Sequence, residues 1–284
     1  MVSPAGPRAG HDVVTRSGTS VHSWVTGPER GPLVVLSHGA TTDSRMFDEQ
    51  VPALTAAGYR ALVWDSRGHG ASRPLGRSPI TVADMAADLL AVLDSLGERG
   101  PVHHVGQSLG TYVAQRIALD SPERVASLVV IGGSSLTLPL PAWQRWGLAA
   151  SRTAFRWWPE RHLRQLSARS TSVVPAVQRY AREAGDQMSR ADLLAVWDAV
   201  TRALDPRPEH RLEHPLLLLV GEHDRTGTVA REAPRWAALD PRCRYEVVPG
   251  AGHTANQDQP EAVNRLLLGF LAEHEPRPTP AEEP

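Results

Sequence analysis

The sequence predicts an α/β protein with a mostly parallel, twisted β-sheet, helices on both faces of the sheet and one helical insertion. Short apolar runs of strand length alternate with segments of helical periodicity, which is typical of a parallel sheet buried on both faces. The alternation stops after residue 131, and residues 138–211 keep helical periodicity without a convincing strand. A serine between two glycines, Ser108, lies where one apolar run passes into a helical segment.

The expected strands are apolar runs rich in β-branched residues and bounded by turn-forming residues. They cover residues 20–25, 33–36, 60–64, 102–105, 127–131, 216–220 and 245–248. A helix is expected over 44–57 and another over 81–96. In the second helix Thr81 and Asp84 have the spacing of a capping box, and Gly97 lies where a helix commonly ends.

Residues 137–212 are predicted to form a helical cap or lid, inserted into a core built from residues 11–136 and 213–274. Within it, Ser189 and Asp192 predict the start of one helix, and Leu193, Trp197, Val200 and Leu204 follow on one face of that helix. The N-terminal residues 1–10 are expected to be flexible. Residues 275–284 contain four prolines and three glutamates, and we expect them to form a disordered tail.

The charge composition excludes several classes of function. The 30 basic and 31 acidic residues leave a net charge of -1, without the basic field expected of a nucleic-acid-binding protein. All basic residues are arginines. The absence of lysine excludes Schiff-base chemistry and a phosphate-binding P-loop lysine.

The single cysteine, Cys243, permits no disulfide and no cysteine-cluster metal site within the chain. A reducing, cytoplasmic compartment is the expectation. No stretch approaches the ~18 apolar residues of a membrane span, and the first ten residues lack the apolar segment of an export signal. We therefore expect no membrane association, no nucleic-acid partner, and a monomer or homodimer.

The strongest chemical signal is the sequence Gly-Gln-Ser-Leu-Gly at residues 106–110. It follows an expected strand and precedes an expected helix, so Ser108 would lie on a tight turn that exposes its hydroxyl above the sheet. A serine hydroxyl needs an adjacent base, most often a histidine oriented by a carboxylate, to act as a nucleophile. Ser108 is therefore the candidate nucleophile.

Two later loops supply the candidate partners of Ser108. Asp224 comes shortly after the buried run 216–220, and His253 comes shortly after the next run, 245–248. Because the carboxyl ends of parallel strands meet at one edge of a sheet, these side chains should approach Ser108. His253 would be the general base and Asp224 the orienting acid. Glu222 remains an alternative acid.

Together these motifs resemble those of the α/β-hydrolase fold, over roughly residues 13–274. Residues 37–40 (Ser-His-Gly-Ala) resemble the oxyanion-hole turn of that family, and residues 65–72 resemble its D-x-R-G-x-G-x-S segment. The resemblance implies that the backbone N–H groups of Ala40 and Leu109 would stabilise an anionic intermediate. His38 is expected to shape the oxyanion turn, and His69 to brace the neighbouring loop.

No histidine spacing indicates a metal site, so neither a metal nor a cofactor is expected. The insertion holds five of the eight tryptophans, and between residues 138 and 212 it has twelve arginines against seven acidic residues. These aromatic residues either pack the insertion onto the core or line an apolar substrate pocket with an arginine near its mouth. The candidates for the pocket are Trp143, Trp146, Trp157 and Trp158.

The resulting functional hypothesis is a serine hydrolase that cleaves a carboxylic ester, lactone or thioester through an acyl-enzyme. Its partner would be a small, ester-like substrate of apolar or aromatic character. The same motifs are compatible with a carbon–carbon bond hydrolase, an acyltransferase or a cofactor-free haloperoxidase. A ligand receptor built on the same scaffold is a further alternative, although no damage to the expected triad indicates it.

Overall fold

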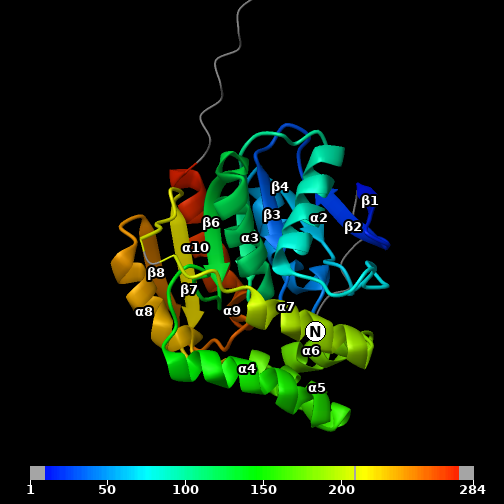
Figure 1. Ribbon diagram of the computed structural model, residues 1–284. Helices are drawn as coiled ribbons and strands as arrows, with labels where there is room; N and C mark the ends of the chain where they lie inside the picture. The colour runs from blue at the N-terminus through cyan, green and yellow to red at the C-terminus, as the bar shows by residue number, and fades with distance from the viewer. Residues whose placement is uncertain (1–9, 208, 275–284) are drawn as a thin grey trace, which may run out of the picture.

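The computed structural model describes residues 10–207 and 209–274 as a single eight-stranded sheet with helices on both faces (Figure 1). The strand order is β1-β2-β4-β3-β5-β6-β7-β8. Strand β2 pairs antiparallel with β1 and β4, and the remaining pairs are parallel. The strands are β1 His11–Arg16, β2 Thr19–Thr26, β3 Leu33–Ser37, β4 Arg60–Trp64, β5 Val102–Gln107, β6 Val125–Ile131, β7 Leu216–Gly221 and β8 Cys243–Val248.

The helices form two layers around the sheet and a separate group at one end of it. They are α1 Gln50–Ala56, α2 Val82–Ser95, α3 Leu109–Asp120, α4 Ala142–Trp157, α5 Glu160–Thr171, α6 Pro175–Asp186, α7 Arg190–Arg202, α8 Val229–Leu239, α9 Ala255–Asp258 and α10 Pro260–Glu273, with 3₁₀ turns η1 Ser44–Phe47 and η2 Pro122–Arg124. Side chains of α2, α3 and α8 share one apolar core with one face of the sheet. Side chains of α1, α9 and α10 share a second core with the other face.

The alternation of side chains along the strands explains these two cores. In β3, Leu33 and Val35 enter the first core, whereas Val34 and Leu36 enter the second. Both faces of a parallel strand are therefore apolar, as expected where helices cover both faces. All four of these residues are at most 4% exposed.

The predicted fold class is confirmed, and each of the seven expected strands is present with ends shifted by a few residues at most. The capping box of α2 is also present, with Thr81 accepting from Asp84 N and the Asp84 carboxylate accepting from Thr81 N. Two local predictions were wrong. Strand β1 was missed, and the helix expected over 44–57 is split into η1 and α1.

Helices α4–α7 lie between β6 and β7 in the chain and cover the end of the sheet to which the parallel strands point (Figure 1). We call these four helices the insertion. The part of residues 137–212 that the structure describes contains no strand. Residues 1–9 and the tail 275–284 lie outside the described residues, whereas Gly10 accepts a hydrogen bond from Val25 N. Within 10–207 and 209–274, no helix has the length and apolar character required to cross a membrane.

Candidate active site

Ser108 occupies a strained turn between β5 and α3. Its φ is 48°, a left-handed conformation that is uncommon for a residue other than glycine. The turn is held by a hydrogen bond of 3.0 Å from Ser108 N to Ile131 O. A Cβ atom on Gly106 would collide with the backbone of Gly110, and one on Gly110 would collide with the carbonyl of Ser37. The two glycines of the motif therefore permit the close packing that holds Ser108 at the end of β5.

Asp224 and His253 meet as the chain order predicted. They lie in the loops that follow β7 and β8, and a hydrogen bond of 2.8 Å from His223 N to Ala251 O joins these loops. His253 Nδ1 is 2.9 Å from Asp224 Oδ2. Both residues are buried, with exposed fractions of 4% and 6% for His253 and Asp224. The arrangement is a buried, charge-assisted pair.

The Asp224 carboxylate determines which nitrogen of His253 carries a proton. Burial raises the pKa of Asp224, but the hydrogen bonds from His253 and Thr226 outweigh burial and hold that pKa below its ordinary value. An ionised carboxylate accepts hydrogen bonds only, so Nδ1 of His253 donates and, in the neutral ring, Nε2 is left with a free lone pair. Thr226 N, 2.8 Å from Asp224 Oδ1, holds the second carboxylate oxygen.

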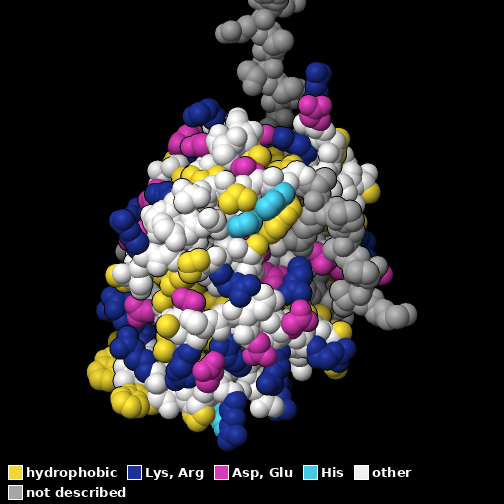
Figure 2. Space-filling model, turned by 90° about the vertical axis from the view of Figure 1, so that its right-hand side faces the viewer, with side chains coloured by type: hydrophobic (Ala, Val, Ile, Leu, Met, Phe, Trp, Pro, Cys, Tyr) yellow, Lys and Arg dark blue, Asp and Glu magenta, His cyan; other side chains and the backbone are white. Residues whose placement is uncertain are grey.

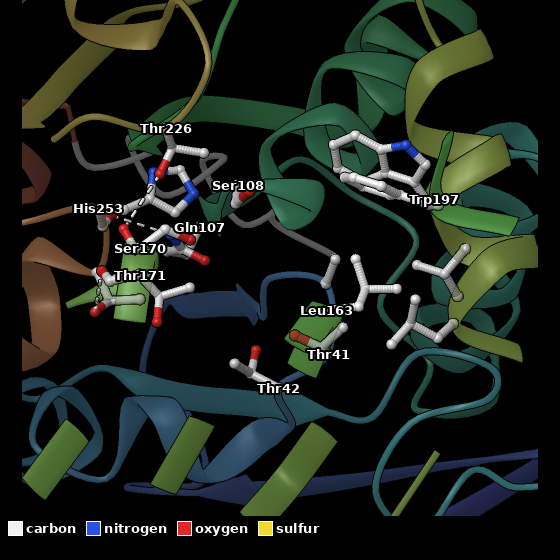
Figure 3. A pocket seen from close by; sticks show the side chains of 15 residues that line it. Thr41, Thr42, Gln107, Ser108, Leu163, Ser170, Thr171, Trp197, Thr226 and His253 are labelled. Carbon is white, nitrogen blue, oxygen red and sulfur yellow. Dashed lines mark hydrogen bonds between the residues drawn. The ribbon is translucent and has the colours of Figure 1, made fainter. Parts of the chain in front are cut away.

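Ser108 and His253 line the same pocket (Figure 3). In Figure 3, the imidazole of His253 lies on one side of the Ser108 side chain and Trp197 on the other. Among the described residues, no hydrogen bond joins Ser108 Oγ to His253. Catalytic hydrogen bonds are often long or poorly aligned in unliganded sites and tighten when a substrate binds.

Two backbone N–H groups are available beside Ser108. Leu109 is the first residue of α3, where a helix leaves its N–H groups without internal partners. Ala40 also lines the pocket, and within the described chain neither Ala40 N nor Leu109 N has an internal acceptor. The next residue, Thr41, has a φ of 63°. Such strain is costly for a β-branched residue, and strained backbone concentrates at functional sites.

His38 and His69 fix the backbone around Ala40. His38 Nε2 accepts from Ser66 N at 2.9 Å, and its Nδ1 lies 2.7 Å from Gly39 O. His69 Nε2 accepts from Thr41 N at 3.2 Å. Burial lowers the pKa of His69 to about 3, so its ring is neutral and can accept. Both histidines have the bracing geometry that the sequence suggested.

Glu222, the alternative acid, points elsewhere. Its Oε2 accepts from Gly250 N at 2.8 Å, and its side chain is 53% exposed. Asp224 is the carboxylate that contacts His253.

The pocket has a volume of about 180 Å³ and combines an apolar wall with a hydroxyl-rich one. The apolar wall comes from the insertion and consists of Phe155, Leu163, Leu193, Val196 and Trp197. The polar wall includes Thr41, Thr42, Ser170, Thr171, Thr226 and Thr254. The described residues that line the pocket include no arginine, aspartate or glutamate.

The prediction that Trp143, Trp146, Trp157 and Trp158 line the pocket was wrong. None of the four is a lining residue, and their exposed fractions are 62%, 77%, 85% and 43%. The opposite face of α4 turns inward. Ser151 on that face accepts from Trp197 Nε1 at 3.1 Å, and Phe155 enters the pocket.

The arginines of the insertion do not line the pocket either. Instead, several bind backbone carbonyls and acidic side chains of the insertion itself. Arg190 donates to the carbonyls of Phe155, Arg156 and Trp158. Arg164 donates to the carbonyls of Gly185 and Met188, and Arg152 pairs with Asp198. These contacts favour a structural role for the arginines that they involve.

Asp258, which was not among the predicted site residues, joins the insertion to the loop of His253. Asp258 is 7% exposed and lies in α9. One carboxylate oxygen accepts from Ser172 Oγ, and the other accepts from Gly252 N at 2.7 Å and Val173 N at 3.2 Å. Gly252 immediately precedes His253. Asp258 follows no strand directly, so no motif marked it.

Comparisons with known proteins identify the family of the chain. The family model described as "Alpha/beta hydrolase family" matches residues 34–266. The chain is 26% identical to a 3-oxoadipate enol-lactonase of Acinetobacter baylyi, covering 91% of this chain and 96% of that protein. It is 28% identical to a carboxylesterase of Bacillus subtilis, covering 91% of this chain and 86% of that protein. A solved hydrolase structure from Pseudomonas aeruginosa aligns with a TM-score of 0.73 and 31% sequence identity, covering 92% of this chain and 98% of that one.

Within the described residues, no group of three or more histidine, cysteine or acidic side chains is arranged to hold a metal ion.

Proposed function

The chain belongs to the alpha/beta hydrolase family, and we propose that it hydrolyses a small, uncharged carboxylic ester, lactone or thioester through an acyl-enzyme on Ser108. His253 is the proposed general base, Asp224 the orienting acid, and the N–H groups of Ala40 and Leu109 the oxyanion donors. The observation that carries the proposal is the buried hydrogen bond between His253 Nδ1 and Asp224 Oδ2, at the wall of the pocket that contains Ser108. A histidine that a buried carboxylate orients, in the same pocket as a serine on a sharp strand-to-helix turn, supports acyl transfer on Ser108.

In the first half of the reaction, Ser108 Oγ attacks the acyl carbon while its proton moves to His253 Nε2. The imidazolium that forms donates through Nδ1 to the ionised Asp224, which stabilises its charge. The negative charge on the substrate oxygen is stabilised by the two N–H groups, each of which contributes roughly 3 kcal/mol in comparable sites. The tetrahedral intermediate collapses as His253 returns the proton to the leaving oxygen or sulfur, and the acyl group stays on Ser108.

In the second half, a water molecule gives its proton to His253 Nε2 and attacks the acyl carbon. Collapse of this second intermediate releases the carboxylic acid and returns the proton to Ser108 Oγ. Ser108, His253 and Asp224 thereby regain their initial protonation states.

The pocket supports a preference for small, uncharged substrates. A cavity of about 150 Å³ in another protein holds a benzene molecule, so about 180 Å³ suits a group of that size or slightly larger. Trp197 and Leu163 offer apolar contact, and the threonines of the other wall offer hydroxyl groups. A carboxylate on the substrate would find no arginine among the described lining residues.

The test is the hydrolysis of p-nitrophenyl esters with acyl chains of increasing length, together with lactones and thioesters. The wild type and Ser108→Ala are compared with Ser170→Ala, which removes a hydroxyl from the same pocket without affecting the turn between β5 and α3. We expect Ser108→Ala to lose at least about 10⁴-fold in kcat and Ser170→Ala to remain within about tenfold of the wild type. Equal activity of wild type and Ser108→Ala would contradict the proposal. Transfer of the acyl group to an added alcohol in place of water would instead identify the chain as an acyltransferase.

A further inference from the structure

Helix α4 exposes a stripe of aromatic side chains on the side of the insertion away from the pocket. Trp143, Trp146 and Trp157 are 62%, 77% and 85% exposed. They are spaced by about one and about three helical turns, so they lie on the same face of α4. With Ala150 and Ala154, which are also exposed, they form one continuous face of α4. We call this face the tryptophan stripe. Tryptophan is usually well buried, and contiguous exposed apolar patches mark interaction surfaces.

The proposed hydrolysis does not require the tryptophan stripe. The stripe turns away from the core, because the pocket and α7 contact the other side of α4 through Ser151 and Phe155. Gln144 on that inner side is buried and donates to Glu232. The same helix therefore has one face that contacts the core and another that is largely exposed.

Positive charge accompanies the tryptophan stripe. Helix α4 contains three arginines and no acidic residue. Arg145 and Arg156 are exposed and have no ion-pair partner in the described chain. On the neighbouring helix α8, the Arg231 guanidinium lies 5.0 Å from the ring centroid of Trp143. Figure 2 shows hydrophobic side chains projecting from the lower edge of the molecule, where α4 and α5 lie in Figure 1, next to many arginines.

The acidic residues near the stripe do not cancel this charge. Glu160 pairs with Arg164, Asp198 pairs with Arg152 and Arg202, and Glu232 contacts Arg231 and Arg235. A second copy of the chain that packed antiparallel on α4 would bring arginine against arginine. An anionic surface would instead satisfy both the exposed aromatic rings and the unpaired guanidinium groups.

We propose that the tryptophan stripe binds reversibly to the surface of an anionic lipid bilayer. The 15 residues from Trp143 to Trp157 extend about 21 Å along the helix axis. Because this is shorter than the roughly 30 Å hydrocarbon core of a bilayer, α4 would lie in the plane of the bilayer rather than cross it. The indole rings would enter the headgroup region, which suits their combination of an apolar ring and one N–H donor. Arg145 and Arg156 would contact lipid phosphates. An exposed helix with aromatic residues on one face and arginines on another is the pattern of interfacial binding.

The test is co-sedimentation of the full chain with two kinds of vesicle, phosphatidylcholine alone and an equimolar mixture of phosphatidylcholine and phosphatidylglycerol. We expect the wild type to partition at least about tenfold more strongly into the anionic vesicles, with a decrease as salt is raised. Trp143→Ala/Trp146→Ala/Trp157→Ala should reduce partitioning into anionic vesicles by about tenfold or more. Arg145→Gln/Arg156→Gln should remove most of the preference for anionic lipid.

The matched control is Leu239→Ala/Val247→Ala, which removes two exposed apolar side chains outside α4. It should bind vesicles like the wild type, and circular dichroism is used to check that every variant is folded. The proposal is overturned if the wild type binds neither vesicle, or if the triple tryptophan variant binds as strongly as the wild type. It is also overturned if light scattering shows a wild-type dimer that the triple variant converts to a monomer, because the stripe would then be a contact between two copies.

Discussion

The loops at the end of the sheet and the helical insertion above them hold their residues by different means. At the end of the sheet, functional groups are fixed by strained backbone and buried hydrogen bonds, as in Ser108 with its φ of 48° and Asp224 bound to His253. The insertion contributes an apolar wall around Trp197 and uses arginines to bind its own carbonyls. Under the proposed function, the sheet supplies the chemistry and the insertion selects the substrate. Changes at the sheet should therefore alter kcat, and changes in the insertion should alter KM.

The largest effect is expected from His253→Ala. Without the imidazole, the Ser108 hydroxyl has no base to take its proton, and kcat should decrease by about 10⁵-fold with the fold intact. Steady-state hydrolysis of a p-nitrophenyl ester, with circular dichroism as the check on folding, measures this. A decrease confined to KM would mean that His253 contacts substrate without acting as the base.

Asp224→Asn should cost about 10⁴-fold in kcat, because an amide no longer holds the His253 tautomer that leaves Nε2 free. Glu222→Gln is the matched control. Its carboxylate contacts Gly250 N rather than His253, so that variant should stay within a few fold of the wild type. The reverse ranking of the two variants would transfer the orienting role to Glu222.

Asp258→Asn tests the junction between the two regions. The amide can accept from only one of the two groups of donors that the carboxylate holds, Ser172 on one side and Gly252 with Val173 on the other. We expect about a tenfold lower kcat, because the loop carrying His253 is less well placed, and about 1–3 kcal/mol lower stability. Kinetics and urea unfolding separate these effects. An unchanged kcat alongside lower stability would make Asp258 purely structural.

Trp197→Ala and Trp146→Ala compare the inner and outer faces of the insertion. The first should raise KM about tenfold for aromatic or branched acyl groups and leave kcat within a few fold, because it removes apolar contact from the pocket wall. Trp146→Ala changes an outward-facing side chain and should leave kcat and KM unchanged. A loss of kcat in Trp197→Ala equal to that in His253→Ala would contradict the division of roles.

A separate prediction concerns the dependence of folding stability on pH. Burial lowers the pKa of His69 to about 3 and that of His104 to about 4, whereas an unfolded histidine titrates near 6.5. Below about pH 6.5, the two histidines bind protons in the unfolded chain but stay neutral in the folded one. The free energy of unfolding therefore decreases as the pH falls, until the pH reaches the pKa values of the two histidines in the folded chain. Between pH 7 and pH 5 the loss should be about 2 kcal/mol for each histidine. Urea unfolding at both pH values measures it, and His104→Gln should reduce the loss by about half. Equal stability at the two pH values would show that burial does not lower the pKa values of these two histidines.

The sequence could predict the residues at the end of the sheet because they follow buried apolar runs. Glycine spacing identified the turn at Ser108, and the order of strands placed Asp224 and His253 together. Strand β1 escaped prediction because it is an edge strand, half exposed, with only two apolar residues, Val13 and Val14. The helix expected over 44–57 is interrupted at residues 48–49. Pro52, four residues after Asp48, has no N–H to donate to the Asp48 carbonyl in a continuous helix.

The insertion was harder to predict because periodicity shows which residues share a face but not which face contacts the core. Trp143, Trp146 and Trp157 do share a face, yet it is the exposed one. The inner face is fixed by contacts distant in sequence, such as Trp197 with Ser151 and Arg152 with Asp198. Asp258 was missed for a similar reason, since its partners lie in a loop that only the folded chain brings near.

Covalent labelling with a fluorophosphonate probe, followed by mass spectrometry of the labelled peptide, tests most directly whether Ser108 is the nucleophile. We expect one adduct on Ser108 in the wild type and none in Ser108→Ala. In His253→Ala, labelling should be at least about 10³-fold slower, because the attacking hydroxyl then lacks its base. Labelling at another residue, or equal labelling of wild type and Ser108→Ala, would contradict the assignment of Ser108 as the nucleophile.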